Sequence, residues 1–263
     1  MRDFVRRHRL PAFWAMAIAL SWAYWIPVAM TGGEMSHFPG LMGPLVAGFV
    51  VTAMADGRNG SWDLARRMVR WRVPGRWYAA ALVPGAVGAV AVAGQALVGE
   101  WPAWRELSSM PGLPEVGWVG TFGMVLVVNG FGEEVGWRGV AWPELRRRRS
   151  IGRAAMLLAV PWAIWHVPVF WIDSGLRGFD LWLVPGWLGG LAAGAVVLGW
   201  LVERADGSLL VVAIFHAFLN MASATPATEG IPAIAASVVV IGWAVWILRR
   251  TVERDVSEIP ASG

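Results

Sequence analysis

The residues best suited to chemistry are a few polar side chains inside otherwise apolar segments. Glu133 and Glu134 are adjacent in one such segment, His166 lies in the next, and His216 and Asn220 share a later one. Carboxylates and imidazoles transfer protons, and imidazole and carboxamide N–H groups stabilise negative charge that develops on oxygen. An ionisable side chain at the centre of a membrane helix costs roughly 2.5–3.5 kcal/mol on insertion scales, so such residues are candidates for a functional site.

Helical spacing separates the two adjacent glutamates. Glu134 and Arg138 are four residues apart and share a helical face, whereas Glu133 is rotated by about 100° from Glu134. We therefore predict that Arg138 pairs with Glu134, which leaves Glu133 free to act elsewhere.

Two further pairs show the same four-residue spacing. Trp162 and His166 share a face in one segment, and His216 and Asn220 share a face in another. His166 lies about 13 residues beyond Arg153, and His216 about 12 residues beyond Arg204. An α-helix rises about 1.5 Å per residue, so these separations correspond to roughly half the thickness of a membrane. Both histidines are therefore expected near the middle of a membrane, with Glu133 somewhat nearer one side.

Each of these residues also has a purely structural interpretation. Either histidine, or Asn220, can form an interhelical hydrogen bond. Glu134 and Arg138 can be an ion pair that only stabilises the fold, and Trp162 can be a packing aromatic. A bundle that needed only packing would not place two carboxylates, two imidazoles and a carboxamide at one depth, so we favour a functional site.

The composition supports a membrane protein. The chain has 263 residues, of which 57% are hydrophobic and 15% charged, whereas soluble domains contain about 25% charged residues. Apolar runs close to the roughly 20 residues that span a bilayer recur along the chain, and we expect a single integral membrane domain over residues 1–263. The fold class is all-α and polytopic, with about eight transmembrane helices forming one bundle around a buried polar cavity. The eight runs lie near 11–30, 38–55, 77–98, 116–137, 154–172, 181–202, 208–224 and 231–248.

The basic residues predict how the bundle is oriented. All 22 are arginines, and, apart from Arg138 at the end of the fourth run itself, 19 of them fall in the terminal segments and in the loops after the second, fourth and sixth runs. The loops after the third and fifth runs hold only Arg105 and Arg177. By the positive-inside rule we expect the plasma membrane as the location, with both termini cytoplasmic. Arginines that flank apolar runs favour a lipid bilayer as the partner and not nucleic acid.

The polar residues resemble the three motifs of the CPBP family of intramembrane glutamic endopeptidases. This family includes CAAX prenyl proteases and bacterial bacteriocin-processing or immunity proteins. The resemblance covers about residues 117–222 and implies an intramembrane endopeptidase. Glu-Glu-x-x-x-Arg matches residues 133–138, aromatic-x-x-x-His matches 162–166, and His-x-x-x-Asn matches 216–220. The second motif usually begins with Phe, so Trp162 departs from the pattern.

The resemblance implies hydrolysis of a membrane-associated peptide or protein. Because the chain has no Cys and no Lys, activated water is the economical nucleophile. Glu133 and His166 would activate it, and His216 and Asn220 would stabilise the oxyanion. By resemblance, Glu134 and Arg138 hold the site in shape, and Trp162 is grouped with them as structural support.

Two alternatives remain open at this stage. Two histidines and a glutamate are an adequate ligand set for zinc, but the His-Glu-x-x-His signature is absent, since Val167 follows His166. We therefore expect no cofactor and no metal. The same polar cluster also fits a non-catalytic scaffold or immunity protein, or a transporter, although transporters usually show repeated halves and none is evident here.

Overall fold

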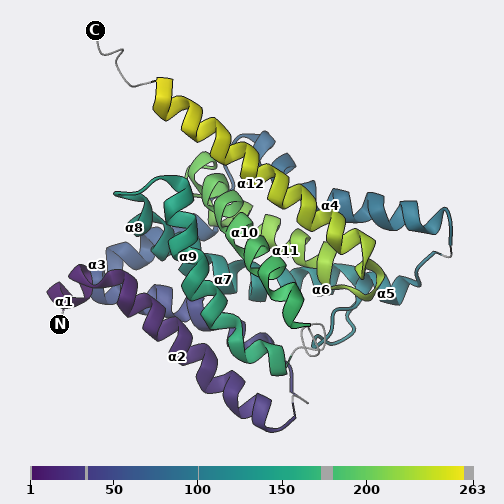
Figure 1. The fold of residues 1–263 in the computed structure, drawn as a ribbon. Helices are drawn as coiled ribbons and strands as arrows, with labels where there is room; N and C mark the ends of the chain where they lie inside the picture. The colour runs from purple at the N-terminus through teal and green to yellow at the C-terminus, as the bar shows by residue number, and fades with distance from the viewer. Residues whose placement is uncertain (1, 33–34, 100, 173–179, 258–263) are drawn as a thin grey trace.

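The fold is helical throughout the part of the chain that the structure describes. A computed structural model describes residues 2–32, 35–99, 101–172 and 180–257, and Figure 1 shows its helices gathered in one bundle. The elements are α1 (Arg2–Arg7), α2 (Arg9–Met30), η1 (Phe38–Met42), α3 (Gly43–Met68), α4 (Gly75–Ala96), α5 (Trp104–Ser108), α6 (Gly117–Val125), η2 (Leu126–Phe131), α7 (Gly132–Gly136), η3 (Trp137–Ala141), α8 (Trp142–Arg146), α9 (Ile151–His166), η4 (Val167–Trp171), η5 (Leu181–Leu183), α10 (Val184–Arg204), α11 (Leu209–Ala224), η6 (Pro226–Thr228) and α12 (Ile231–Ser257).

Six helical segments in the described residues are long and apolar enough to cross a membrane. They correspond to six of the eight predicted runs. The run 208–224 forms the shorter apolar helix α11, and the run 116–137 forms the consecutive elements α6, η2 and α7. The prediction of an all-α polytopic membrane bundle is confirmed. The six segments are Arg9–Met30, Phe38–Met68, Gly75–Ala96, Ile151–Trp171, Val184–Arg204 and Ile231–Thr251.

The second predicted run continues as helix beyond its expected end at residue 55. Gly57 has a φ of +72° and kinks α3, after which the helix continues to Met68. The kink occurs where Arg2 and Arg6 of α1 donate from Nε to the Ala55 carbonyl oxygen, at 3.2 and 2.7 Å. Glycine adopts this backbone conformation without steric cost, and the arginines satisfy the carbonyl beside the kink.

The element that carries the two glutamates lies between two π-helical stretches. Helical residues run without interruption from Gly117 to Arg146, and η2 and η3 are the π-helical parts on either side of α7. Such wide turns are rare and concentrate at functional sites. Glycine lets neighbouring elements approach closely here, since a Cβ on Gly130 would lie 2.7 Å from the Ala213 oxygen of α11.

Serine caps fix the starts of the two helices that carry the histidines. The Ser150 and Ser208 side chains accept from the backbone N–H groups of Arg153 and Val211, at 3.5 and 3.3 Å, at the starts of α9 and α11. Serine is a preferred N-cap because its oxygen satisfies an otherwise unpaired backbone donor. The caps therefore set where each histidine lies along its helix.

The two ends of the bundle carry the segments that the arginine pattern assigned to opposite sides. In Figure 1, α1 and α8 lie toward one end and α5 toward the other. Arg105 is in α5, whereas Arg177 lies outside the described residues. Which end is cytoplasmic stays a prediction.

Candidate active site

Both glutamates of α7 are buried. Glu133 is 2% exposed and Glu134 is not exposed, and Arg138 of η3 is also completely buried. Arg138 Nη1 donates to Glu134 Oε1 at 3.0 Å, the pairing that the four-residue spacing predicts. A buried carboxylate beside a guanidinium avoids the large cost of an uncompensated charge.

His216 of α11 lies between the two carboxylates. Its Nδ1 donates to Glu134 Oε1 at 2.7 Å, and its Nε2 lies 3.9 Å from Glu133 Oε1. Because a carboxylate oxygen accepts, the hydrogen on Nδ1 points toward Glu134. The hydrogen bond to Glu134 orients the imidazole and leaves Nε2 facing Glu133.

Trp162 of α9 contacts both acidic and basic members of the cluster. Its indole Nε1 donates to Glu133 Oε2 at 2.8 Å, and its ring lies 4.5 Å from the Arg138 guanidinium carbon. Arg138 Nε and Nη2 have no hydrogen-bond partner among the described residues. The aromatic ring therefore supplies a cation–π contact to a guanidinium that has few hydrogen bonds.

His166 ends α9 at the edge of this cluster. Its Nδ1 lies 2.8 Å from the Trp162 carbonyl oxygen, and its ring packs against Trp165 and Trp187 with centroids 4.6 and 5.7 Å apart. A carbonyl oxygen only accepts, so Nδ1 carries the hydrogen and neutral His166 keeps its lone pair on Nε2. His166 is half-buried, unlike His216.

Asn220 lies four residues after His216 in α11 and is also half-buried. Its side chain makes no hydrogen bond with any residue that the structure describes. The structure thus brings Glu133, Glu134, Arg138, Trp162 and His216 into one contact network. His166 joins this network through Trp162, and Asn220 is next to it only by helical spacing.

Arg67 supports this network and was not singled out by the sequence. Its guanidinium donates to the Gly207 and Gly139 carbonyl oxygens, both at 3.0 Å, and to the Arg138 carbonyl oxygen at 3.4 Å. Arg67 thereby fastens η3 to the turn between α10 and α11. In the sequence it is one of several neighbouring arginines, and no local pattern distinguishes it from Arg66.

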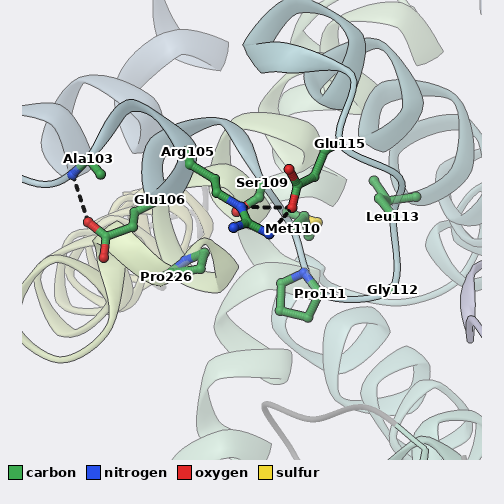
Figure 2. A pocket seen from close by; sticks show the side chains of 10 residues that line it. All are labelled: Ala103, Arg105, Glu106, Ser109, Met110, Pro111, Gly112, Leu113, Glu115 and Pro226. Carbon is green, nitrogen blue, oxygen red and sulfur yellow. Dashed lines mark hydrogen bonds and ion pairs between the residues drawn. The ribbon is translucent and has the colours of Figure 1, made fainter. Parts of the chain in front are cut away.

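The structure also has a hollow at the end of the bundle that holds α5. It has a volume of about 570 Å³ and contains none of the predicted site residues. Arg105 and Glu115, on its wall, form an exposed ion pair (Figure 2). Within the described ranges, no group of three or more His, Asp or Glu side chains is arranged to hold a metal ion.

The fold and the cluster define a polytopic helical membrane protein with a buried carboxylate–imidazole site. A family model described as type II CAAX prenyl endopeptidase Rce1-like matches residues 115–222. This match over residues 115–222 confirms the resemblance to that protease family. The chain is also similar to the CAAX prenyl protease 2 of Methanococcus maripaludis, with 26% identity over 94 residues. That match covers 34% of the chain and 34% of the relative, so the chain spans about a third of the relative's length.

Proposed function

We propose that this protein is an intramembrane endopeptidase that hydrolyses a peptide bond of a membrane-associated peptide or protein. The observation that carries the proposal is the pair of Glu133 Oε1 and His216 Nε2, 3.9 Å apart in a buried site. Both residues lie in the segment that matches a protease family. Residues 1–263 would form one membrane domain, with a protease core at about 117–222.

Glu133 acts as the general base in this proposal. Its carboxylate takes a proton from a water molecule while the water oxygen bonds to the scissile carbonyl carbon, and the C=O bond becomes an oxyanion. The proton then passes to the amide nitrogen as the C–N bond breaks. His166 assists the proton transfer, because its Nδ1 hydrogen bond to the Trp162 carbonyl leaves Nε2 as the acceptor.

His216 and Asn220 stabilise the oxyanion. Glu134 holds the imidazole through Nδ1, so a protonated His216 presents an N–H at Nε2, and Asn220 supplies a carboxamide N–H from the same helical face. Loss of one such donor typically costs about 2.7–4 kcal/mol of transition-state stabilisation. In this scheme Arg138 and Trp162 support Glu134 and Glu133, and no metal ion takes part.

The substrate class follows from where the site lies. A site buried among membrane helices is reached by a peptide that is itself anchored in or on the bilayer. The relative from Methanococcus maripaludis is named a CAAX prenyl protease. A panel of test substrates should therefore contain prenylated peptides together with unprenylated membrane peptides.

The test compares peptides released from membranes that contain the wild type or the Glu133→Gln variant. Glu133→Gln should abolish release while the protein stays folded and inserted. Glu144→Gln is the matched control, because Glu144 lies outside the site and pairs with Arg147. Cleavage should also continue after exhaustive chelation of metals. Full activity of Glu133→Gln would refute the mechanism, and tolerance of substitutions at both Glu133 and His216 would favour a non-catalytic scaffold.

A further inference from the structure

The indole N–H of Trp162 makes a contact that a phenylalanine at the same position cannot make. Nε1 donates to Glu133 Oε2 at 2.8 Å, and both side chains are at most 5% exposed. The other carboxylate oxygen, Oε1, faces His216 Nε2 at 3.9 Å. The two oxygens of one carboxylate therefore have different partners from different helices.

We propose that Trp162 is a positioning residue that makes Glu133 Oε1 the proton acceptor of the reaction. This proposal rests on the proposed function, since it concerns the same general base. The indole hydrogen bond holds Oε2, fixes the rotation of the carboxylate, and leaves Oε1 directed toward His216. A carboxylate without this bond can rotate about its terminal torsion, because the distribution of that torsion angle is broad in glutamate side chains.

The surroundings of Trp162 hold the indole rigidly in this orientation. The Arg138 guanidinium carbon lies 4.5 Å from the ring centroid, and the His216 ring meets the indole edge to face at 6.2 Å. Gly194 of α10 also lies near the ring, since a Cβ added there would be 3.9 Å from it. Contacts from η3 and α11 thus restrain the donor, and a donor placed in advance lowers the cost of reaching the reactive geometry.

The test replaces Trp162 by Phe, which keeps an aromatic ring and removes the N–H. The substrate is the membrane peptide that the wild type cleaves best in the comparison of released peptides. We expect kcat to fall by about 10- to 100-fold, as the loss of a hydrogen bond to a charged group implies. We expect KM to change by less than about twofold, because Trp162 contacts the base and not the substrate.

Trp142→Phe is the matched control. Trp142 is 1% exposed and its Nε1 donates to Glu203 Oε1 at 2.9 Å. This is also a buried indole bonded to a carboxylate, but it lies outside the contact network of Glu133. The kcat of Trp142→Phe should stay within about twofold of wild type, even though Trp142→Phe and Trp162→Phe each lose a little stability with the hydrogen bond.

A second replacement separates the N–H from the shape of the ring. Benzothienylalanine at position 162 has the size of tryptophan and a sulfur in place of the N–H, so it should lower kcat as Phe does. Without any substrate, the indole ¹⁵N–¹H resonance that disappears in Trp162→Phe should shift in Glu133→Gln and stay unchanged in Glu144→Gln.

Wild-type kcat in both Trp162 variants, with Glu133→Gln inactive, would overturn the role of Trp162 and leave the proposed function intact. A resonance that does not respond to Glu133→Gln would also overturn it. An active Glu133→Gln variant would instead refute the general base itself, so the two failures are distinguishable.

Discussion

The molecule contains two ion pairs of the same chemistry in opposite environments. Arg138 and Glu134, in the contact network of α7, are both completely buried. Arg105 and Glu115, at the hollow near α5, have side chains that are 76% and 58% exposed. Exposed pairs contribute about 0–1 kcal/mol, whereas removal of one partner from a buried pair costs about 3–5 kcal/mol.

The buried pair, unlike the exposed pair, keeps two charges away from water, which costs desolvation free energy. A buried ion pair is often no more stabilising than apolar residues of the same size, so stability alone does not explain Arg138 and Glu134. Glu134 also orients His216, and this second contact is the one that the proposed mechanism needs. The exposed pair has no such link, and changes there should affect little else.

The largest effect is expected when the buried pair is broken. Arg138→Met keeps side-chain volume but leaves Glu134 without its guanidinium partner, so we expect destabilisation by about 3–5 kcal/mol and loss of activity. Thermal unfolding in detergent measures the loss of stability, and peptide release measures the loss of activity. The double variant Glu134→Leu/Arg138→Met should recover part of the stability and none of the activity. A wild-type melting temperature for the single variant would contradict the comparison.

A large effect on rate alone is expected at Asn220. Asn220→Ala should lower kcat by about 100- to 1000-fold if the carboxamide stabilises the oxyanion. The melting temperature should hardly change, because the Asn220 side chain makes no hydrogen bond within the described residues. Ser223→Ala, on the same helix, is the control, since the Ser223 hydroxyl donates only to the Leu219 carbonyl at 2.7 Å. An unchanged kcat would remove Asn220 from the mechanism.

An intermediate effect is expected at Arg67, which supports the buried network from outside. Arg67→Lys keeps the charge but not the planar fork that reaches three carbonyl oxygens, so it should cost about 1–2 kcal/mol of stability. Activity should fall with it, because the backbone of Arg138 loses its fastening. Arg66→Lys, at an exposed neighbour, should have no measurable effect. Equal melting temperatures for the two variants would show that the three hydrogen bonds do not matter.

The smallest effect is expected at the exposed pair. Arg105→Ala should change stability by at most about 1 kcal/mol and leave peptide release unchanged. Added salt should reduce even this difference, because screening weakens interactions between exposed charges. Loss of activity in Arg105→Ala would indicate that the hollow of Figure 2 participates in function, and the distinction between the two regions would fail.

Local spacing predicted those parts of the site that lie on one helix. The Glu134–Arg138 pair follows from a separation of four residues, and apolar runs of near-membrane length predicted where the helices lie. The contact of His216 with Glu134 joins residues 82 positions apart. It depends on how α11 is rotated against α7, and no residue pattern within either helix specifies that rotation.

Two other features escaped prediction for similar reasons. Nothing in the composition of Leu126–Phe131 or Trp137–Ala141 marks these stretches as π-helical. Arg67 donates to backbone oxygens, which every residue possesses, so no side-chain pattern in the sequence indicates its partners.

The sequence indicated His166 as the partner of Glu133, whereas in the structure His216 Nε2 lies 3.9 Å from Glu133 Oε1. The catalytic role of each histidine stays a prediction.

The two π-helical stretches around α7 have a consequence for how this segment can change over evolutionary time. A π-helical turn accommodates one residue more than an α-helical turn. Loss of a single codon within Leu126–Phe131 could therefore be absorbed as ordinary α-helix, with no break in the backbone. The residues on either side would then keep nearly the same orientation relative to their partners. A single-residue deletion within the regular α-helix α6 would instead rotate the residues before it by about 100° relative to α7. Within this segment, the π-helical stretches are therefore the places where the chain can lose a residue without turning Glu133 and Glu134 away from their partners.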